Sequence, residues 1–201
     1  WRIFMAKHKP NKPVESMTDH TLSHNITEAT ELWNKILNSL YEKQNEQLSQ
    51  PPQNPDPFAI GNALSEAWMY YLQNPEKAIH QQLDLLEDYG QLWQHMNEKL
   101  SGKDTTPLVT PSPKDRRFKD ESWNTNPFYD AIKQSYLINA NWLKDTFGNI
   151  ETMDQHNTQK IRFFTDQFID AMSPSNFMWT NPEVVRTAIE TKGESIVTGL
   201  K

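Results

Sequence analysis

Two adjacent arginines, Arg116 and Arg117, form a basic patch that could bind an anion. Guanidinium groups suit carboxylates and phosphates because they donate paired hydrogen bonds. Asp115 and Asp120 flank the two arginines, however, and arginines beside carboxylates are more often held in ion pairs within the protein. We therefore favour a structural role for this patch over an anion-binding site.

Residues suited to catalysis or metal binding are few. The chain has no cysteine, so these 201 residues contain no disulfide, no thiolate ligand and no thiol nucleophile. Neither Ser173 nor Ser175 lies in the Gly-x-Ser-x-Gly sequence of a hydrolase nucleophile elbow. We therefore do not assign either serine as a nucleophile with His156 as its base. His20 and His24 have a spacing that suits two metal ligands on a helix, but no third ligand completes the site. We assign no catalytic, cofactor-binding or metal-binding residue.

Composition narrows the classes of partner. The net charge of −6 argues against nucleic acid, because phosphate binding requires a surplus of clustered Lys and Arg. No apolar run approaches the ~20 residues that span a bilayer. Residues 1–16 carry charge but no apolar core of a secretory signal. We expect a cytoplasmic protein with no transmembrane segment and no nucleic-acid partner.

The hydrophobic spacing predicts an all-α fold of about six helices, arranged as a bundle or as hairpins in two sections. Residues 1–24 show no helical period and are predicted to form a flexible basic tail. Residues 25–100 form a variable N-terminal helical section, and residues 101–113, SGKDTTPLVTPSP, form a linker. Residues 114–201 form the second helical section.

Caps and prolines predict where the helices of the first section begin. The starts are a capping box at Asn25 and Glu28, Asp56 before Pro57, and Asn74 before Pro75, while Gly102 ends the third helix. Each helix carries an apolar stripe that we assign to the core, although a stripe wider than its neighbours can cover would be a docking face. The stripes are Ala29, Leu32, Trp33, Ile36, Leu37, Leu40 and Tyr41; Phe58, Ala63, Leu64, Ala67, Trp68, Tyr71 and Leu72; and Ile79, Leu83, Leu86, Tyr89, Trp93, Met96 and Leu100.

The second section repeats the Asn-Pro start signal. Asn126 is predicted to cap an aromatic helix that begins at Pro127 and is covered on two sides. Gly148-Asn149 ends it, and a further helix starts near Asp154. Its predicted core stripe is Ile161, Phe164, Phe168, Ile169 and Met172. Ser173 to Asn176 closes that helix, and Asn181-Pro182 starts the last one.

Three blocks of this section resemble one family in their order and spacing. They are DRRFKDESWNTNPFYDAIKQSYL from Asp115, FIDAMSPSNFMWTNPEVVR from Phe168 and GESIVTGLK from Gly193. They resemble the N-terminal region of class I poly(3-hydroxyalkanoate) synthases, also called poly-beta-hydroxybutyrate polymerases; residues 1–114 match only loosely. The family-motif residues, with a structural or interaction role, are Asp115, Arg116, Arg117, Phe118, Trp123, Asn126, Pro127, Phe128, Tyr136, Asp170, Ser173, Pro174, Asn176, Phe177, Asn181 and Pro182.

The resemblance implies a bacterial cytoplasmic acyltransferase that polymerises (R)-3-hydroxyacyl-CoA into storage polyester and releases CoA. In that family a downstream α/β-hydrolase domain carries the chemistry, with a Cys nucleophile, a His base and an orienting Asp. The N-terminal part is associated with dimer formation, attachment to the polyester granule and contacts with granule proteins. No cofactor is implied.

This chain departs from the family pattern because it lacks the cysteine and its elbow sequence. We therefore expect the non-catalytic N-terminal region of such a synthase. Its expected partners are the catalytic domain of the same or a related synthase, a second copy of itself, and the granule surface or granule proteins. Two alternatives stay open: a fragment of an active acyltransferase whose catalytic domain follows Lys201, and a stand-alone helical adaptor that regulates a synthase.

Overall fold

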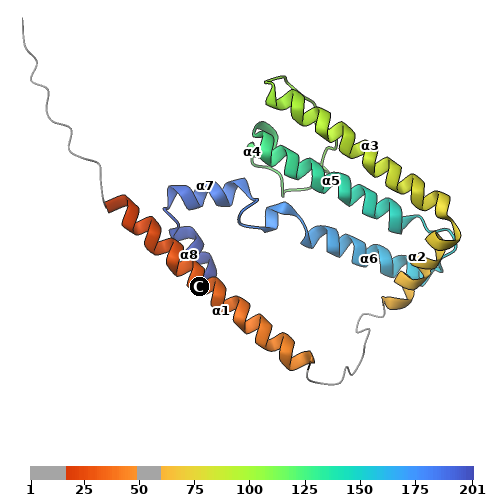
Figure 1. Ribbon diagram of the computed structural model, residues 1–201, viewed down its shortest axis with the longest axis horizontal. Helices are drawn as coiled ribbons and strands as arrows, with labels where there is room; N and C mark the ends of the chain where they lie inside the picture. Colours follow the sequence, from red (N-terminus) through yellow and green to blue (C-terminus); the bar gives the residue numbers. More distant parts are fainter. Residues whose placement is uncertain (1–16, 49–59) are drawn as a thin grey trace, which may run out of the picture. The chain divides into compact units, whose positions relative to one another are not determined.

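A computed structural model describes residues 17–48 and 60–201, and the all-α prediction is confirmed within them (Figure 1). The helices are α1 (Met17–Leu48), α2 (Gly61–Gln73), α3 (Pro75–Leu100), α4 (Ser122–Thr125), α5 (Pro127–Gly148), α6 (Gln155–Ala171), α7 (Pro182–Glu190) and α8 (Glu194–Leu200), with a 3-10 turn η1 (Pro174–Asn176). Over the described residues there are thus eight α-helices instead of about six, and the short α4 and α8 are the unforeseen ones. The predictions for Asp56, Pro57, Phe58 and the side chains of His20, Leu40 and Tyr41 lie outside the described residues.

The described residues divide into two compact units, residues 17–48 with 187–201, and residues 60–186. In the first unit α1 packs against α8. The Glu28 carboxylate accepts from Lys201 Nζ at 2.8 Å, and Asn25 Nδ2 donates to the carbonyl of Lys192 at 2.9 Å. The helix begins at Met17, so the predicted start at Asn25 is wrong. The Asn25 side chain pairs with another segment and does not cap the helix.

The second unit is built around α5, which lies between α3 and α6 (Figure 1). This arrangement confirms that α5 is covered on two sides. The segment predicted to be a linker, residues 101–113, lies inside this unit. Its Val109 N–H donates to Gln134 Oε1 at 2.8 Å, and Gln134 Nε2 donates to Val109 O at 3.1 Å. The predicted division at residues 101–113 therefore does not coincide with the division of the structure.

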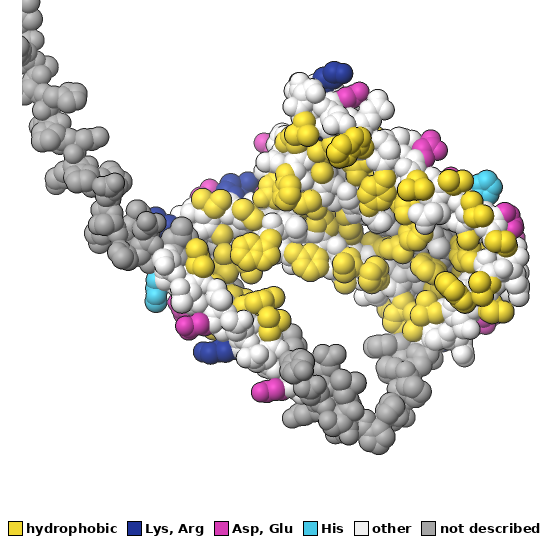
Figure 2. All heavy atoms as spheres, viewed as in Figure 1, with side chains coloured by type: hydrophobic (Ala, Val, Ile, Leu, Met, Phe, Trp, Pro, Cys, Tyr) yellow, Lys and Arg dark blue, Asp and Glu magenta, His cyan; other side chains and the backbone are white. Residues whose placement is uncertain are grey.

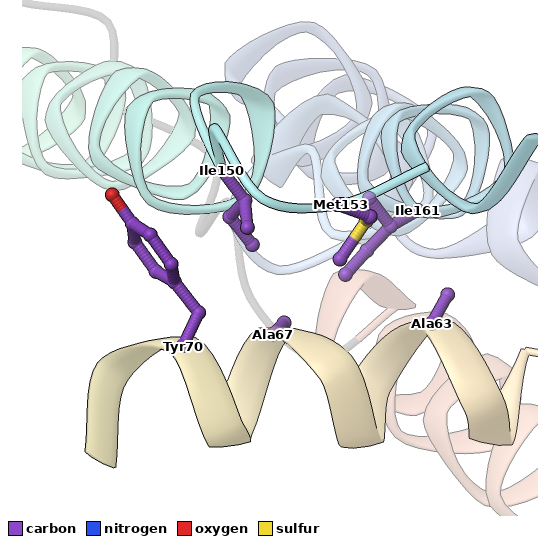
Figure 3. Packing of buried hydrophobic residues seen from close by; sticks show 6 residues of the cluster. All are labelled: Ala63, Ala67, Tyr70, Ile150, Met153 and Ile161. Atoms are coloured by element: carbon purple, nitrogen blue, oxygen red, sulfur yellow. The ribbon is translucent and has the colours of Figure 1, made fainter. Parts of the chain in front are cut away.

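Helix α2 packs on α6 through a narrow face of small residues. Ala63 and Ala67 are one turn apart and buried, and Figure 3 shows both facing Ile150, Met153 and Ile161. Side chains that end at Cβ allow the two helix backbones to approach closely. Burial of Ala63 and Ala67 confirms part of the predicted α2 stripe.

Several residues assigned to the core are in fact exposed. The prediction is wrong for Leu64, Trp68 and Leu72 of α2, for Ile79, Leu83, Leu86, Tyr89, Trp93 and Leu100 of α3, and for Phe168 and Met172 of α6. In α1 the side chains of Trp33 and Leu37 are also exposed. The face of α3 that is buried carries Leu92 and His95. Periodicity located an apolar face of α3, but a different face packs on α5.

Candidate functional site

Arg117 joins three segments that are distant in the sequence. Its Nε donates to Asp115 Oδ1 at 2.9 Å and its Nη2 to Asp115 Oδ2 at 2.8 Å. Its Nη1 donates to the Tyr136 hydroxyl and to Asp170 Oδ1, both at 2.9 Å. Tyr136 in turn donates to the carbonyl of Ile169 at 3.0 Å. All three guanidinium nitrogens are engaged within the protein, which supports the structural interpretation of Arg117, while Arg116 is exposed.

The carboxylates of this network are held in their charged form. The hydrogen bond from Arg117 lowers the pKa of Asp115, and this effect outweighs its partial burial. Asp120 accepts from Arg186 Nη2 at 2.6 Å and from the backbone of Ser122 at 2.9 Å. These two bonds lower the pKa of Asp120 to about 2. Both aspartates that flank the basic patch are thus partners of arginines in the same unit.

An aromatic cluster lies directly beneath Arg117. Trp123 is 1% exposed and packs edge-on against Phe118, with ring centroids 5.1 Å apart. Tyr129 and Tyr136 extend the cluster, each 5.8 Å from a neighbouring ring. The cluster therefore fixes the loop before α4 onto α5.

The Asn-Pro pairs at Asn126 and Asn181 act as helix caps. Asn126 Oδ1 accepts from the backbone N–H of Phe128 at 2.9 Å and of Tyr129 at 3.5 Å, with Pro127 as the first residue of α5. Asn181 Oδ1 accepts from Glu183 N–H at 3.0 Å, and buried Pro182 opens α7. A side-chain oxygen at this position satisfies N–H groups that have no partner inside the helix. Both predicted helix starts are confirmed.

Residues 173–177 close α6 in a compact turn. Asn176 Nδ2 donates to the carbonyls of Asp170 at 2.8 Å and Ala171 at 3.2 Å. Ser173 is fully buried, and its hydroxyl lies 2.9 Å from that of Ser175. Pro174 is buried and Phe177 is exposed. The turn satisfies carbonyl groups at the end of the helix and leaves an aromatic ring on the surface.

Replacing Asn126 by alanine is expected to lower the free energy of unfolding by about 1 kcal/mol, because two N–H groups of α5 lose their acceptor. Chemical denaturation followed by circular dichroism measures this loss. The matched control is Asn141→Ala on the exposed side of the same helix, where alanine is the better helix former and stability should not fall. Equal losses in the two variants would contradict the capping role.

The serines near His156 do not form a nucleophile–base pair. His156 lies in the first turn of α6, and Ser173 follows its last turn. A helix of 17 residues rises about 25 Å, so the two side chains lie at opposite ends of it. The structure therefore does not place His156 where it could act as a base for Ser173 or Ser175.

A buried ionic cluster that the sequence did not reveal links α3 to α5. Asp130 Oδ2 lies 2.8 Å from His95 Nε2 and 2.6 Å from Lys99 Nζ, and its Oδ1 lies 3.0 Å from Lys133 Nζ. Lys133 Nζ also donates to the carbonyl of Trp123 at 2.9 Å and to Asn124 Oδ1 at 2.6 Å. Asp130 and Lys133 are each 1% exposed. The i, i+4 pair on α3 and the i, i+3 pair on α5 were the only signals in the sequence.

Burial alone would raise the pKa of Asp130. Hydrogen bonds from Lys99, His95 and Lys133 act in the opposite direction, and the net effect is a lowered pKa. Asp130 is therefore a fixed negative charge that holds cationic groups from two helices. Such a cluster ties α3 to α5, and both carboxylate oxygens of Asp130 have cationic partners within the chain.

A hollow of about 380 Å³ lies beside this cluster, lined in part by His95, Glu98, Asp104 and Thr105. The Thr105 hydroxyl oxygen is buried and has no hydrogen-bond partner among the described residues. Over residues 17–48 and 60–201, no three His, Asp or Glu side chains are grouped closely enough to hold a metal ion. None of the helices described has the length and apolar character needed to cross a membrane.

The feature most suited to binding is the set of large apolar side chains on the surface of the second unit. On the side shown in Figure 2, hydrophobic side chains cover a broad area of this unit and charged groups lie mainly at its margins. Isolated exposed apolar residues are normal, but a contiguous patch marks a site of interaction. The exposed large apolar residues of α2, α3, α6 and the segment after α6 are Leu64, Trp68, Met69, Leu72, Ile79, Leu83, Leu86, Tyr89, Trp93, Leu100, Phe163, Phe168, Met172, Phe177 and Trp179.

Comparison with known proteins gives one family match for the second helical section. Residues 114–201 match the family described as the N-terminus of poly-beta-hydroxybutyrate polymerase. The chain carries the N-terminal domain of this polymerase family. The Arg117 network, the aromatic cluster and the caps of α5 and α7 all lie within the matched residues. No solved structure matches the chain.

Curated relatives extend the similarity beyond that domain. The chain is 38% identical over 138 residues to a poly(3-hydroxyalkanoate) polymerase of Methylorubrum extorquens, covering 69% of this chain and 22% of the relative. It is 40% identical over 116 residues to the polymerase subunit of Cupriavidus necator, covering 58% of this chain and 18% of the relative. The chain thus spans about a fifth of the length of these relatives. The 138-residue match is too long to fit within residues 114–201, so the similarity extends into the section before residue 114.

Proposed function

We propose that this chain is the non-catalytic N-terminal region of a class I poly(3-hydroxyalkanoate) synthase. It serves self-association, attachment to the polyester granule and support of the catalytic domain in polyhydroxybutyrate biosynthesis. The observation that carries the proposal is the contrast within the second unit. Polar motif residues such as Arg117 and Asn126 have hydrogen-bond partners within the unit, whereas many large apolar side chains remain exposed.

The last turn of α6, together with the segment that follows it, is the best candidate for contact with polyester. Phe168, Met172, Phe177 and Trp179 are exposed within twelve residues of sequence. A polyester surface offers apolar chain and carbonyl acceptors but no donors. Trp suits such a boundary because its ring is apolar and its indole N–H can donate a hydrogen bond. Each large side chain that is fully buried on binding contributes roughly 1.5–3 kcal/mol.

Sedimentation with amorphous poly(3-hydroxybutyrate) particles tests this attachment. The 201-residue chain should sediment with the particles, and the triple variant Phe168→Ser, Phe177→Ser and Trp179→Ser should bind at least about tenfold more weakly, since each 1.4 kcal/mol lost is a factor of ten. The matched control replaces the exposed glutamines Gln155, Gln159 and Gln167 of α6 by serine and should bind normally. A chain that stays in the supernatant would rule out granule attachment.

The alternative is that the chain is part of an active acyltransferase that polymerises (R)-3-hydroxyacyl-CoA. The observation that favours it is that the chain spans only about a fifth of the length of these relatives. It requires a Gly-x-Cys-x-Gly sequence, followed by Asp and His, in the same reading frame beyond Lys201. The purified 201-residue chain should release no CoA from (R)-3-hydroxybutyryl-CoA, because it has no thiol to hold the acyl chain.

A further inference from the structure

Helix α3 has one face covered by α5 and a second, apolar face that α5 does not cover. The covered face carries buried Leu92 and His95, and Trp142 Nε1 of α5 donates to the carbonyl of Gln81 at 3.0 Å. The other face carries Ile79, Leu83, Leu86, Trp93 and Leu100, whose exposed fractions are 59, 54, 58, 71 and 69%. We call these five residues, with Gly90 and Asn97 that lie between them, the α3 stripe.

The spacing of the α3 stripe is that of a helix-pairing seam. Its members, from Ile79 to Leu100, are alternately four and three residues apart. This alternation averages 3.5 residues per turn, the repeat at which two helices wind around each other with a left-handed twist. In heptad terms Ile79, Leu86, Trp93 and Leu100 are d positions, and Leu83, Gly90 and Asn97 are a positions. The stripe covers three heptads, or about 33 Å of helix.

The residues beside the α3 stripe limit what it can bind. Four of the six flanking e and g positions are polar: His80, Gln82, Glu87 and Gln94. The apolar seam is therefore narrow, which suits a second helix better than a flat apolar surface. A Cβ added at Gly90 would meet no atom within 4 Å, so a bulky side chain of a partner can enter next to it.

We propose that the α3 stripe pairs in parallel and in register with the α3 stripe of a second copy of this chain. Parallel pairing places Asn97 opposite its own copy, where the two amides can hydrogen-bond; a single Asn at an a position is the device that fixes register in parallel two-helix coils. An apolar partner would leave that amide unpaired. This inference specifies the surface for the self-association in the proposed function and therefore rests on that function.

Charge does not oppose this pairing. In a parallel pair, each g position faces the e position five residues later on the other helix. Gln82 therefore faces Glu87 of the second copy, and Tyr89 faces Gln94. No like charges meet along the seam. The space at Gly90 leaves room for the two Trp93 rings of the adjacent layer.

Analytical ultracentrifugation of the 201-residue chain tests the proposal, with Leu86→Glu as the disruptive variant. The wild-type chain should form a dimer, and Leu86→Glu should weaken it at least about tenfold because two carboxylates then face each other in one layer. Leu86 is exposed in the single chain, so the thermal midpoint of the dilute variant should be unchanged. The matched control is Phe163→Glu, an exposed apolar residue of α6, which should leave the dimer intact.

Cysteine cross-linking tests the orientation, because these 201 residues contain no cysteine to interfere. Ile79→Cys alone and Leu100→Cys alone should each form a disulfide-linked dimer under mild oxidation, since d positions face each other in a parallel pair. Cross-linking only in a mixture of the two variants would show antiparallel pairing and overturn the proposal. A monomeric wild-type chain, or a dimer unaffected by Leu86→Glu, would overturn it as well. Sedimentation with polyester particles is read separately, so granule attachment can fail or hold independently of this dimer.

Discussion

Replacing Trp123 by alanine is expected to lower the free energy of unfolding by about 3–5 kcal/mol, the usual cost of truncating a fully buried Trp. The indole ring is 1% exposed and contacts Phe118 and Tyr129 edge-on. Removing it leaves a cavity between the loop before α4 and helix α5, and the neighbouring rings lose their partner. The carbonyl of Trp123 also receives the Lys133 ammonium, so a shift of this loop disturbs the buried ionic cluster.

Urea denaturation followed by far-ultraviolet circular dichroism measures the effect of Trp123→Ala. This signal reports helix content and does not depend on the fluorescence of the residue that is removed. The matched control is Trp179→Ala, whose ring is 75% exposed, and its stability should change by no more than about 0.5 kcal/mol. A Trp123→Ala chain as stable as the control would show that the aromatic cluster does not hold α4 to α5.

Replacing Asp130 by asparagine is expected to destabilise the chain by about 3–5 kcal/mol, because removing one partner leaves buried charge without compensation. The change preserves the size of the side chain and removes only its charge. Lys133 is 1% exposed and would then be cationic beside neutral groups, and His95 and Lys99 would lose the same partner. Adding Lys133→Met to Asp130→Asn should recover part of the loss, since it removes the most deeply buried cation.

The pH dependence of stability provides a second measurement on Asp130. Its pKa is lower in the folded chain than in the unfolded chain, where an aspartate has a pKa of about 3.9. The stabilisation is therefore fully present above that value and is lost as the pH falls through the folded pKa. Wild type should lose more stability on acidification below about pH 4 than Asp130→Asn does. The matched control, Asp145→Asn on the exposed side of α5, should follow the wild-type curve.

The starts of the helices could be predicted because their signals are local. Asn74-Pro75, Asn126-Pro127 and Asn181-Pro182 each place a polar cap or a proline where N–H groups of a first turn lack partners. These requirements depend on the few residues at the helix end. Gly102 has a φ of +77° after α3, which agrees with its prediction as an end signal.

The covered face of α3 could not be predicted, because periodicity identifies an apolar face but not what covers it. The α3 stripe has a more regular apolar spacing than the face that carries His95 and Lys99. That second face is buried because its polar groups meet Asp130, which lies 35 and 31 residues away in the sequence. A partner at that distance leaves no local signal. The Asn25 capping box failed for a related reason, since the helix continues through it from Met17.

The paired hydrogen bonds between Gln134 and Val109 have a practical consequence for engineering the chain. Residues 101–113 are rich in Pro, Ser and Thr and look like a natural place for a spacer or an affinity tag. Yet the side-chain amide of Gln134 hydrogen-bonds to both the N–H and the carbonyl of Val109, as the backbone of a neighbouring strand would. An insertion next to Val109 would break these two hydrogen bonds and leave the buried amide of Gln134 without partners. Fusion partners are better joined at residues whose backbone makes no such hydrogen bonds to a buried side chain.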